Sequence, residues 1–203
     1  MFICFEGIAG SGKTSQSRLL KGYLEKLLGK DVFLSAVYEG SKKEEISSFI
    51  NKLEIKGNSI AEMFLFQSLH SVQFKQVYEA INKDQVVICD RWRYSFFAHH
   101  LHNNTFDGNL NLMSQIDFLA FGSLNPDIII LFDLPADLAY TRYLERESLN
   151  GGDGLELMNF DYFLSVSNYY RQLALENNWH IIECLGDEAH VFSTITTIIN
   201  KYV

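Results

Sequence analysis

Gly7-Ile8-Ala9-Gly10-Ser11-Gly12-Lys13-Thr14 is the stretch that decides the fold, because it satisfies the pattern G-x-x-x-x-G-K-[ST] at every fixed position. In such a loop, glycines let consecutive backbone N–H groups turn inward and hold phosphate oxygens. A following helix adds the positive end of its dipole. The pattern therefore predicts a nucleotide phosphate site, whose expected binding residues are Gly7, Ala9, Gly10, Ser11, Gly12, Lys13, Thr14 and Ser15.

The flanking sequence supplies the strand and the helix that this loop requires. Residues 1–6 form a short apolar run rich in aromatic side chains, which is typical of a buried strand. After Thr14, leucines and a tyrosine recur at helical spacing as far as Leu28, and Gly29 stands where a helix would end. This context disfavours the alternative, a glycine-rich turn with an incidental lysine.

The composition indicates one globular domain that is not built to bind nucleic acid. The chain has 203 residues, enough for a sizeable core. Its formal charge is −8, from 17 basic and 25 acidic residues, and an acidic protein is a poor binder of nucleic acid or of membrane surfaces. A site for nucleotides would have to concentrate the few cations in one place.

Cysteine usage and hydropathy favour a soluble cytoplasmic protein. Cys4, Cys89 and Cys184 lie in strand-like apolar runs, and an odd number without C-x-x-C spacing indicates reduced core residues. The N-terminus lacks the basic region of a signal peptide. The longest apolar run, residues 128–132, is too short to cross a bilayer.

Apolar runs alternate with helical patterns, which predicts an α/β fold with a parallel sheet and helices on both faces. The clearest helix covers 59–82, with a Ser59-x-x-Glu62 capping box, and residues 106–111 are expected to form a loop. The glycine-rich segment within about 146–158 is either a mobile lid or a plain surface connection. Five strands are expected, at residues 1–6, 31–36, 85–90, 127–133 and 180–183.

Asp90-Arg91 directly follows the third expected strand and forms a second candidate site. Ligands of open α/β sheets bind beyond the carboxyl ends of the strands, where the loop after the first strand also lies. Asp90 is therefore placed to hold Mg²⁺ together with Thr14, and Arg91 to contact a phosphate with its planar fork. The alternative is a surface salt bridge at a strand end.

Motifs in order over nearly the whole chain resemble those of thymidylate kinases, a family of P-loop nucleoside monophosphate kinases. The matching segments are Phe5-Glu6-Gly7-x-x-Gly10-x-Gly12-Lys13-Thr14-x-Gln16, Ala61-Glu62-x-x-Leu65-Phe66, Asp90-Arg91-Trp92-x-x-Ser95, Pro126-Asp127 and Val166-x-x-x-Tyr170.

The resemblance implies a three-layer P-loop kinase fold with a five-stranded parallel sheet and a small lid. It implies transfer of the γ-phosphoryl group of ATP to dTMP, with ATP and Mg²⁺ bound, in a homodimer. Lys13, Arg91, Arg146 and Glu6 would be the catalytic side chains. Phe66 would stack on the pyrimidine; a core position on an apolar helix face is the alternative for it. The implied substrate-binding residues are Glu39, Phe66, His70, Arg91, Ser95 and His99.

Three departures from the family pattern lie on the acceptor side of the site. Ala9 stands where such kinases usually carry an acidic residue, and Tyr38 replaces the arginine expected after the second strand. His70 replaces an arginine that grips the acceptor monophosphate, and a histidine would be a weaker, pH-dependent ligand. The residues on the donor side match the family pattern. The departures therefore make dTMP less certain as the acceptor than ATP as the donor.

The lid leaves two arginines to choose between. Arg142 and Arg146 lie a helical turn apart, and Arg146 is expected to supply transition-state charge because it is nearer the glycines. The alternative for Arg146 is a surface ion pair with Glu145 or Glu147. Arg93 is a further basic group that could replace the missing phosphate contact or face solvent.

The cluster His99-His100-x-His102 invites a zinc interpretation, which the sequence disfavours because adjacent helical residues point about 100° apart. His99 or His100 is instead expected in the substrate pocket. Two other functions stay open: a deoxynucleoside kinase with Glu6 as general base on a sugar hydroxyl, or a nucleotide-binding protein without turnover.

Overall fold

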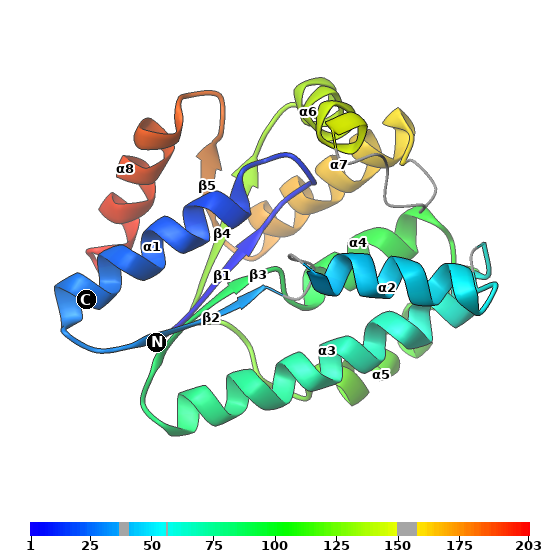
Figure 1. The fold of residues 1–203 in the computed structure, drawn as a ribbon, viewed down its shortest axis with the longest axis horizontal. Helices are drawn as coiled ribbons and strands as arrows, with labels where there is room; N and C mark the ends of the chain where they lie inside the picture. The colour runs from blue at the N-terminus through cyan, green and yellow to red at the C-terminus, as the bar shows by residue number, and fades with distance from the viewer. Residues whose placement is uncertain (37–40, 56, 150–157) are drawn as a thin grey trace.

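One parallel sheet forms the centre of the molecule (Figure 1). The computed structural model describes residues 1–36, 41–55, 57–149 and 158–203. In these segments the strand order is β2-β3-β1-β4-β5, and all pairs are parallel. The strands are β1 (Phe2–Glu6), β2 (Val32–Ala36), β3 (Val86–Asp90), β4 (Ile128–Asp133) and β5 (His180–Glu183). The five predicted strands are confirmed, four of them starting one residue later than expected.

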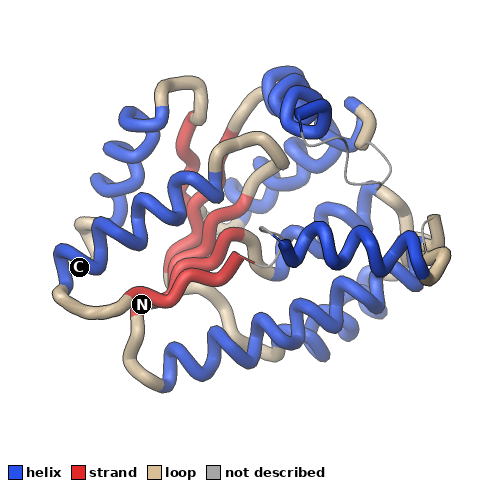
Figure 2. Tube along the Cα trace, viewed as in Figure 1, coloured by secondary structure: helices blue, strands red, loops and turns tan. Residues whose placement is uncertain are grey.

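Helices cover both faces of the sheet, which confirms the three-layer prediction (Figure 2). On one face α1 and α8 pack together, and on the other α3 and α7 pack against the strands, with α5 alongside α3. The helices within the described segments are α1 (Lys13–Leu28), α2 (Ser41–Lys52), α3 (Ser59–Asn82), α4 (Arg93–His102), α5 (Leu110–Phe121), α6 (Ala136–Leu149), α7 (Phe160–Glu176) and α8 (Glu188–Ile199).

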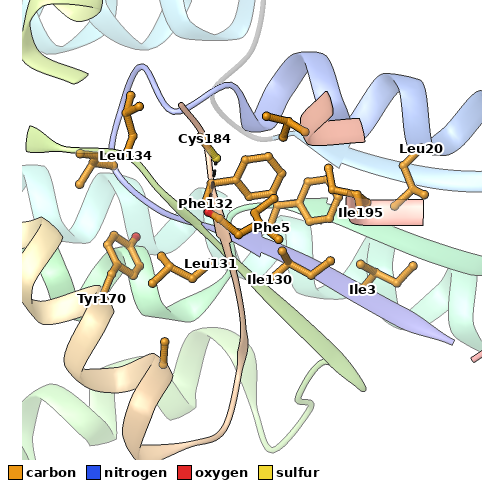
Figure 3. Packing of buried hydrophobic residues seen from close by; sticks show 14 of the residues in the cluster. Ile3, Phe5, Leu20, Ile130, Leu131, Phe132, Leu134, Tyr170, Cys184 and Ile195 are labelled. Atoms are coloured by element: carbon orange, nitrogen blue, oxygen red, sulfur yellow. Dashed lines mark hydrogen bonds between the residues drawn. The ribbon is translucent and has the colours of Figure 1, made fainter. Parts of the chain in front are cut away.

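Residues of β1 alternate between two cores, as the two-residue period of a strand requires. Ile3 and Phe5 pack in the core that contains Leu20 of α1, part of which Figure 3 shows. Phe2 and Cys4 pack in the second core, which contains Val77 of α3. Because the strand is buried on both sides, its sequence is apolar throughout until the polar residue Glu6 at its carboxyl end.

The helix predicted over 59–82 is confirmed, but its predicted cap and the end of the predicted loop at 106–111 are wrong, and asparagine capping explains both. Asn58, not Ser59, caps α3: its side chain accepts the N–H of Ala61, while Glu62 accepts the N–H of Gly57. The expected loop at 106–111 is shorter, because Asn109 caps α5 and the helix begins at Leu110. The end of α1 is as predicted, since Gly29 takes a left-handed φ of 64° after Leu28.

The three cysteines are free and buried, as the sequence predicts. Cys4 and Cys89 lie opposite each other on β1 and β3, and burial raises the pKa of both thiols. Among the parts of the chain that the structure describes, no helix is both long enough and apolar enough to cross a membrane.

Candidate active site

The loop between β1 and α1 is packed so closely that two of its glycines cannot be replaced without a backbone shift. Gly7 has a φ of 141°, and a Cβ there would lie 2.7 Å from the carbonyl oxygen of Phe132 in β4. Gly10 has a φ of 81°, and its Cβ would lie 2.8 Å from the carbonyl oxygen of Ala139 in α6. The loop is thus held between β4 and α6 at the carboxyl edge of the sheet.

Lys13 lies in this loop with its ammonium group buried. Its Nζ donates to the carbonyl oxygen of Ile8 at 2.7 Å and to the hydroxyl of Ser11 at 3.0 Å. Burial, together with the nearby charge of Arg91, lowers the pKa of Lys13 to about 7, although Asp90 and Glu6 oppose the shift. A polyphosphate beside Lys13 would stabilise the protonated form.

Asp90 and Thr14 meet where a divalent cation would be held. The Thr14 hydroxyl donates to Asp90 Oδ2 at 2.5 Å. Asp90 is 7% exposed, yet its buried Oδ1 has no hydrogen-bond partner among the residues that the structure describes. An unpaired buried carboxylate oxygen beside a hydroxyl is a donor set that Mg²⁺ prefers, so these two residues fit the expected ion.

Arg91 adopts a backbone conformation that is rare for a side-chain-bearing residue. Its φ is 76°, a left-handed value that costs on the order of 1 to 3 kcal/mol outside glycine. This turn lets adjacent residues point in different directions: Asp90 reaches Thr14, while the Arg91 guanidinium donates to Ser95 at 3.0 Å and to Tyr170 at 3.4 Å. The site thereby gains a half-buried cation whose charge acts on Lys13.

Glu6 is the hub that holds this arrangement. Its side chain is fully buried, and burial raises its pKa, although Arg91 and three hydrogen bonds oppose the shift. Oε1 accepts the backbone N–H of Trp92 at 2.9 Å. Oε2 accepts the hydroxyls of Ser95 at 3.0 Å and Tyr170 at 2.9 Å. Both oxygens of Glu6 are therefore engaged in fixing the surroundings of Arg91.

His70 lies on α3 and is nearly fully buried. Its Nδ1 is hydrogen-bonded to Oε1 of Gln67 at 2.8 Å, and its ring lies 4.9 Å from that of Phe121. Burial lowers its pKa to about 4, so the ring is neutral near pH 7. It therefore lacks the permanent charge of the arginine that the sequence analysis expects at this position.

The remaining acceptor-side residues that the structure describes lie on α3 and α4. Phe66 is half-buried on α3, and Ser95 on α4 belongs to the Glu6 network. His99 accompanies Tyr162 of α7, with ring centroids 5.8 Å apart, and burial lowers its pKa to about 4. Tyr38 and Glu39 lie outside the described residues, as does most of the lid segment.

Of the two lid arginines, the structure brings Arg142 to the loop and not Arg146. Arg142 donates to the carbonyl oxygen of Gly10 at 3.4 Å. Arg146 forms an ion pair with the buried carboxylate of Glu147 at 3.2 Å and lies over the ring of Tyr143. The pairing with Glu147 corresponds to the alternative that the sequence left open.

Arg93 takes neither of its two expected roles. It forms an ion pair with Asp117 of α5 at 3.2 Å, and its side chain is only 12% exposed. It also donates to the carbonyl oxygen of Gly122 and to Asn125. The contact that it supplies is therefore structural, between α4 and α5.

Sequence reasoning gave no role to Tyr170 or Gln73. Tyr170 belongs to a motif that the sequence shows, but nothing in the sequence pairs it with Glu6, 164 positions away. Gln73 is a polar residue on the inner face of α3, and only its contacts reveal a function: it donates to Ser35 and to the carbonyl oxygen of Arg91.

The buried ammonium of Lys13, the half-buried guanidinium of Arg91, the glycine loop and the carboxylate of Asp90 share the carboxyl edge of a parallel sheet. Such an edge suits the terminal phosphates of a nucleotide. The fold and this site define the protein as a P-loop phosphotransferase. Within this class, the chain belongs to the thymidylate kinase family, whose sequence profile matches residues 5–195.

Individual relatives agree with this assignment. The chain is 30% identical to a thymidylate kinase of Anaplasma phagocytophilum, over all of this chain and 91% of the relative. It is 32% identical to one of Anaplasma marginale, over 98% and 93% of the two chains. The crystal structure of thymidylate kinase from Ehrlichia chaffeensis has the same fold, with a TM-score of 0.72 at 24% identity, covering 98% of each chain. The protein is thus a nucleoside monophosphate kinase by family.

Proposed function

We propose that this protein transfers the γ-phosphoryl group of ATP to the phosphate of dTMP, with Mg²⁺ bound, in spite of its altered acceptor side. The observation that carries the proposal is a pair of neighbouring cations, the buried Lys13 and the half-buried Arg91, whose charge helps to lower the pKa of Lys13. Like charges held close together repel, and a polyphosphate bound between them would relieve that repulsion.

Each donor-side residue has a defined task in this proposal. Lys13 and the backbone amides of the loop hold the β- and γ-phosphates, and Arg91 neutralises charge where donor and acceptor phosphates meet. Thr14 and the free oxygen of Asp90 would hold Mg²⁺, which supplies charge neutralisation on the phosphate oxygens. Positioning and electrostatics of this kind are sufficient for phosphoryl transfer.

The acceptor would lie along α3 and α4. Phe66 would stack on the pyrimidine, His99 would line the pocket, and Glu39 would contact the acceptor. His70 would contact the acceptor phosphate as a neutral ring, leaving Arg91 as the main cation for that group. Because His70 carries no charge, we expect a higher KM for the acceptor dTMP, and not a different reaction.

Phosphorylation of a nucleoside is the less favoured alternative. That reaction needs a general base for the sugar hydroxyl, and Glu6 is the residue that would supply it. Both carboxylate oxygens of Glu6 already accept hydrogen bonds, and the side chain is fully buried. The geometry therefore supports a structural role for Glu6 and not a role as general base, and this favours a phosphate over a sugar hydroxyl as the acceptor.

The first test is ADP release from ATP and Mg²⁺ with purified protein and a panel of acceptors: dTMP, dUMP, dCMP, thymidine and deoxycytidine. We expect turnover with dTMP that exceeds turnover with either nucleoside, and loss of the signal when Mg²⁺ is chelated. Faster turnover of thymidine than of dTMP would contradict the proposal. Absence of turnover with every acceptor would favour a binding protein.

We also propose that the protein is a homodimer in the cytoplasm. Its three buried, free cysteines suit a reducing compartment. On the outer side of α3 and α5, large apolar side chains are exposed, and a shallow depression of about 440 Å³ lies on α5. Such a face suits a second copy of the chain. Its most exposed members are Phe64, Val72, Leu110, Phe118 and Leu119.

Replacing Leu119 with glutamate tests the dimer. Leu119 is 83% exposed, so a charge there costs the fold little but would be buried in a dimer interface. We expect the wild type to sediment as a dimer and Leu119→Glu as a monomer. The matched control is Leu175→Glu, at a residue that is 72% exposed and lies on α7 rather than on α3 or α5. A monomeric wild type at tens of micromolar would refute the proposal.

A further inference from the structure

The peptide bond between Arg91 and Trp92 is held on both sides. The Trp92 N–H donates to Glu6 Oε1 at 2.9 Å, and the Arg91 carbonyl oxygen accepts the Gln73 side-chain amide at 3.2 Å. The Arg91 N–H itself donates to the carbonyl oxygen of Phe5 at 3.0 Å. These three bonds define the left-handed conformation at a residue that would not adopt it alone.

Gln73 is the only one of these three partners that belongs to α3 rather than to β1. Its side chain is 2% exposed, and its amide nitrogen donates to the Ser35 hydroxyl at 3.1 Å as well as to Arg91. Without this donor, the Arg91 carbonyl loses its side-chain partner, and the peptide can rotate towards an ordinary backbone conformation.

Release of the Arg91 carbonyl would let the strained φ of Arg91 relax from 76° towards an ordinary negative value, and this relaxation would change where the guanidinium points. Arg91 reaches Ser95 and Tyr170 from the left-handed conformation, and a change in φ redirects the whole side chain. Since the Arg91 side chain must meet phosphate oxygens with a planar fork, a small error in direction lowers transition-state stabilisation more than substrate binding.

We propose that Gln73 is a positioning residue for phosphoryl transfer, which acts by holding the Arg91 carbonyl and thereby the left-handed backbone that aims the guanidinium. This inference rests on the role of Arg91 in the proposed function. It also links α3, which carries Phe66 and His70 on the acceptor side, to the arginine proposed to lie where donor and acceptor phosphates meet.

The kinetic test uses Gln73→Leu, which removes the donor at similar volume, and Gln73→Glu, which keeps the shape but presents an acceptor to a carbonyl oxygen. Both variants should lower kcat by about 10- to 100-fold with little change in the KM for ATP. In an Arg91→Ala background, Gln73→Leu should cause no further loss of kcat, because residues that act through one group are not additive. Equal losses in both backgrounds would overturn the proposal.

Ser35→Ala is the matched control, since it removes the other acceptor of the same amide and leaves the bond to Arg91. We expect its kcat to stay near that of the wild type, and thermal unfolding of each variant shows whether it is folded. A loss of kcat in Ser35→Ala as large as in Gln73→Leu would assign the effect to β2 packing and refute a role through Arg91.

A second measurement needs no turnover and so separates this proposal from the proposed function. The chain has two tryptophans, Trp92 and Trp179, so ¹⁵N-tryptophan labelling gives few amide signals. Gln73→Leu should shift the Trp92 backbone amide and leave Trp179 in place, whereas Ser35→Ala should leave both. An unmoved Trp92 amide in Gln73→Leu would refute the proposal even in an active enzyme. If the Trp92 amide shifts but the wild-type protein does not turn over dTMP, the role of Gln73 in holding the Arg91 backbone is supported and the proposed function is contradicted.

Discussion

Replacing Lys13 with methionine should lower kcat by roughly 10²- to 10³-fold, the loss typical of removing one charge-stabilising donor from a transition state. The reason lies in its position: the ammonium is buried in the loop and already donates to two loop oxygens, so phosphate oxygens can replace these partners without rearranging the helix. Methionine keeps the length and apolar character of the stem but not the charge.

The same residue predicts a proton uptake on nucleotide binding. Burial lowers the pKa of Lys13 to about 7, so at pH 8 much of the free enzyme has a neutral amine. Bound polyphosphate favours the charged form, and ATP binding at pH 8 should therefore take up close to one proton. Calorimetry in buffers of different ionisation enthalpy measures this number directly.

Lys26→Met is the control for both measurements, because Lys26 is an exposed lysine in the last turn of the same helix. It should leave kcat and proton uptake unchanged. If Lys13→Met retains more than about a tenth of wild-type kcat, the loop lysine does not carry the charge stabilisation assigned to it.

Folding stability should fall steeply as the pH drops from 7 to 5. Burial lowers the pKa of His70 to about 4 and that of His100 to about 3, against about 6.5 for an unfolded histidine. A group with a depressed pKa in the folded state excludes protons there. Its stability contribution is full above pH 6.5 and is lost as the pH falls towards 4 and 3, by roughly 2 kcal/mol per histidine at pH 5.

Acidic groups oppose part of this loss. Burial raises the pKa of Asp117 to about 6 and also raises that of Glu6, so both take up protons more readily in the folded state. The difference between variants isolates the histidines. We expect the double variant His70→Gln/His100→Gln to lose clearly less stability between pH 7 and pH 5 than the wild type, measured by urea unfolding at each pH.

The control for the pH experiment is His190→Gln, because His190 is exposed on α8. It should show the wild-type pH dependence. A double variant with an unchanged pH dependence would mean that these two rings are not the source of the acid sensitivity.

Local sequence signals predicted the sheet and the donor side because both are encoded in short segments. The loop motif fixes Lys13 and Thr14 by spacing alone, and a strand end places Asp90 beside them. The Thr14–Asp90 contact joins residues 76 positions apart, yet the rule for parallel strands was enough to anticipate it.

Long-range side-chain contacts could not be predicted in this way. The sequence presents Glu6 as a possible base, and only the fold shows that Tyr170 and the Trp92 amide occupy both of its oxygens. The left-handed φ of Arg91 has no sequence signature, since arginine rarely adopts it. Arg146 was expected near the phosphates, and the sequence left open the ion pair with its neighbour Glu147 that it forms in this structure.

The close approach of Gly10 to Ala139 limits how this enzyme can be recombined with relatives. Because the carbonyl oxygen of Ala139 fills the space where a Cβ would stand, the loop and the first turn of α6 form one fitted surface. A chimera that imports a relative's lid together with α6 would also import a foreign surface against Gly10. The junction of the chimera should therefore be placed after Arg142, so that Ala139 and Arg142, which contact the loop, remain those of this protein.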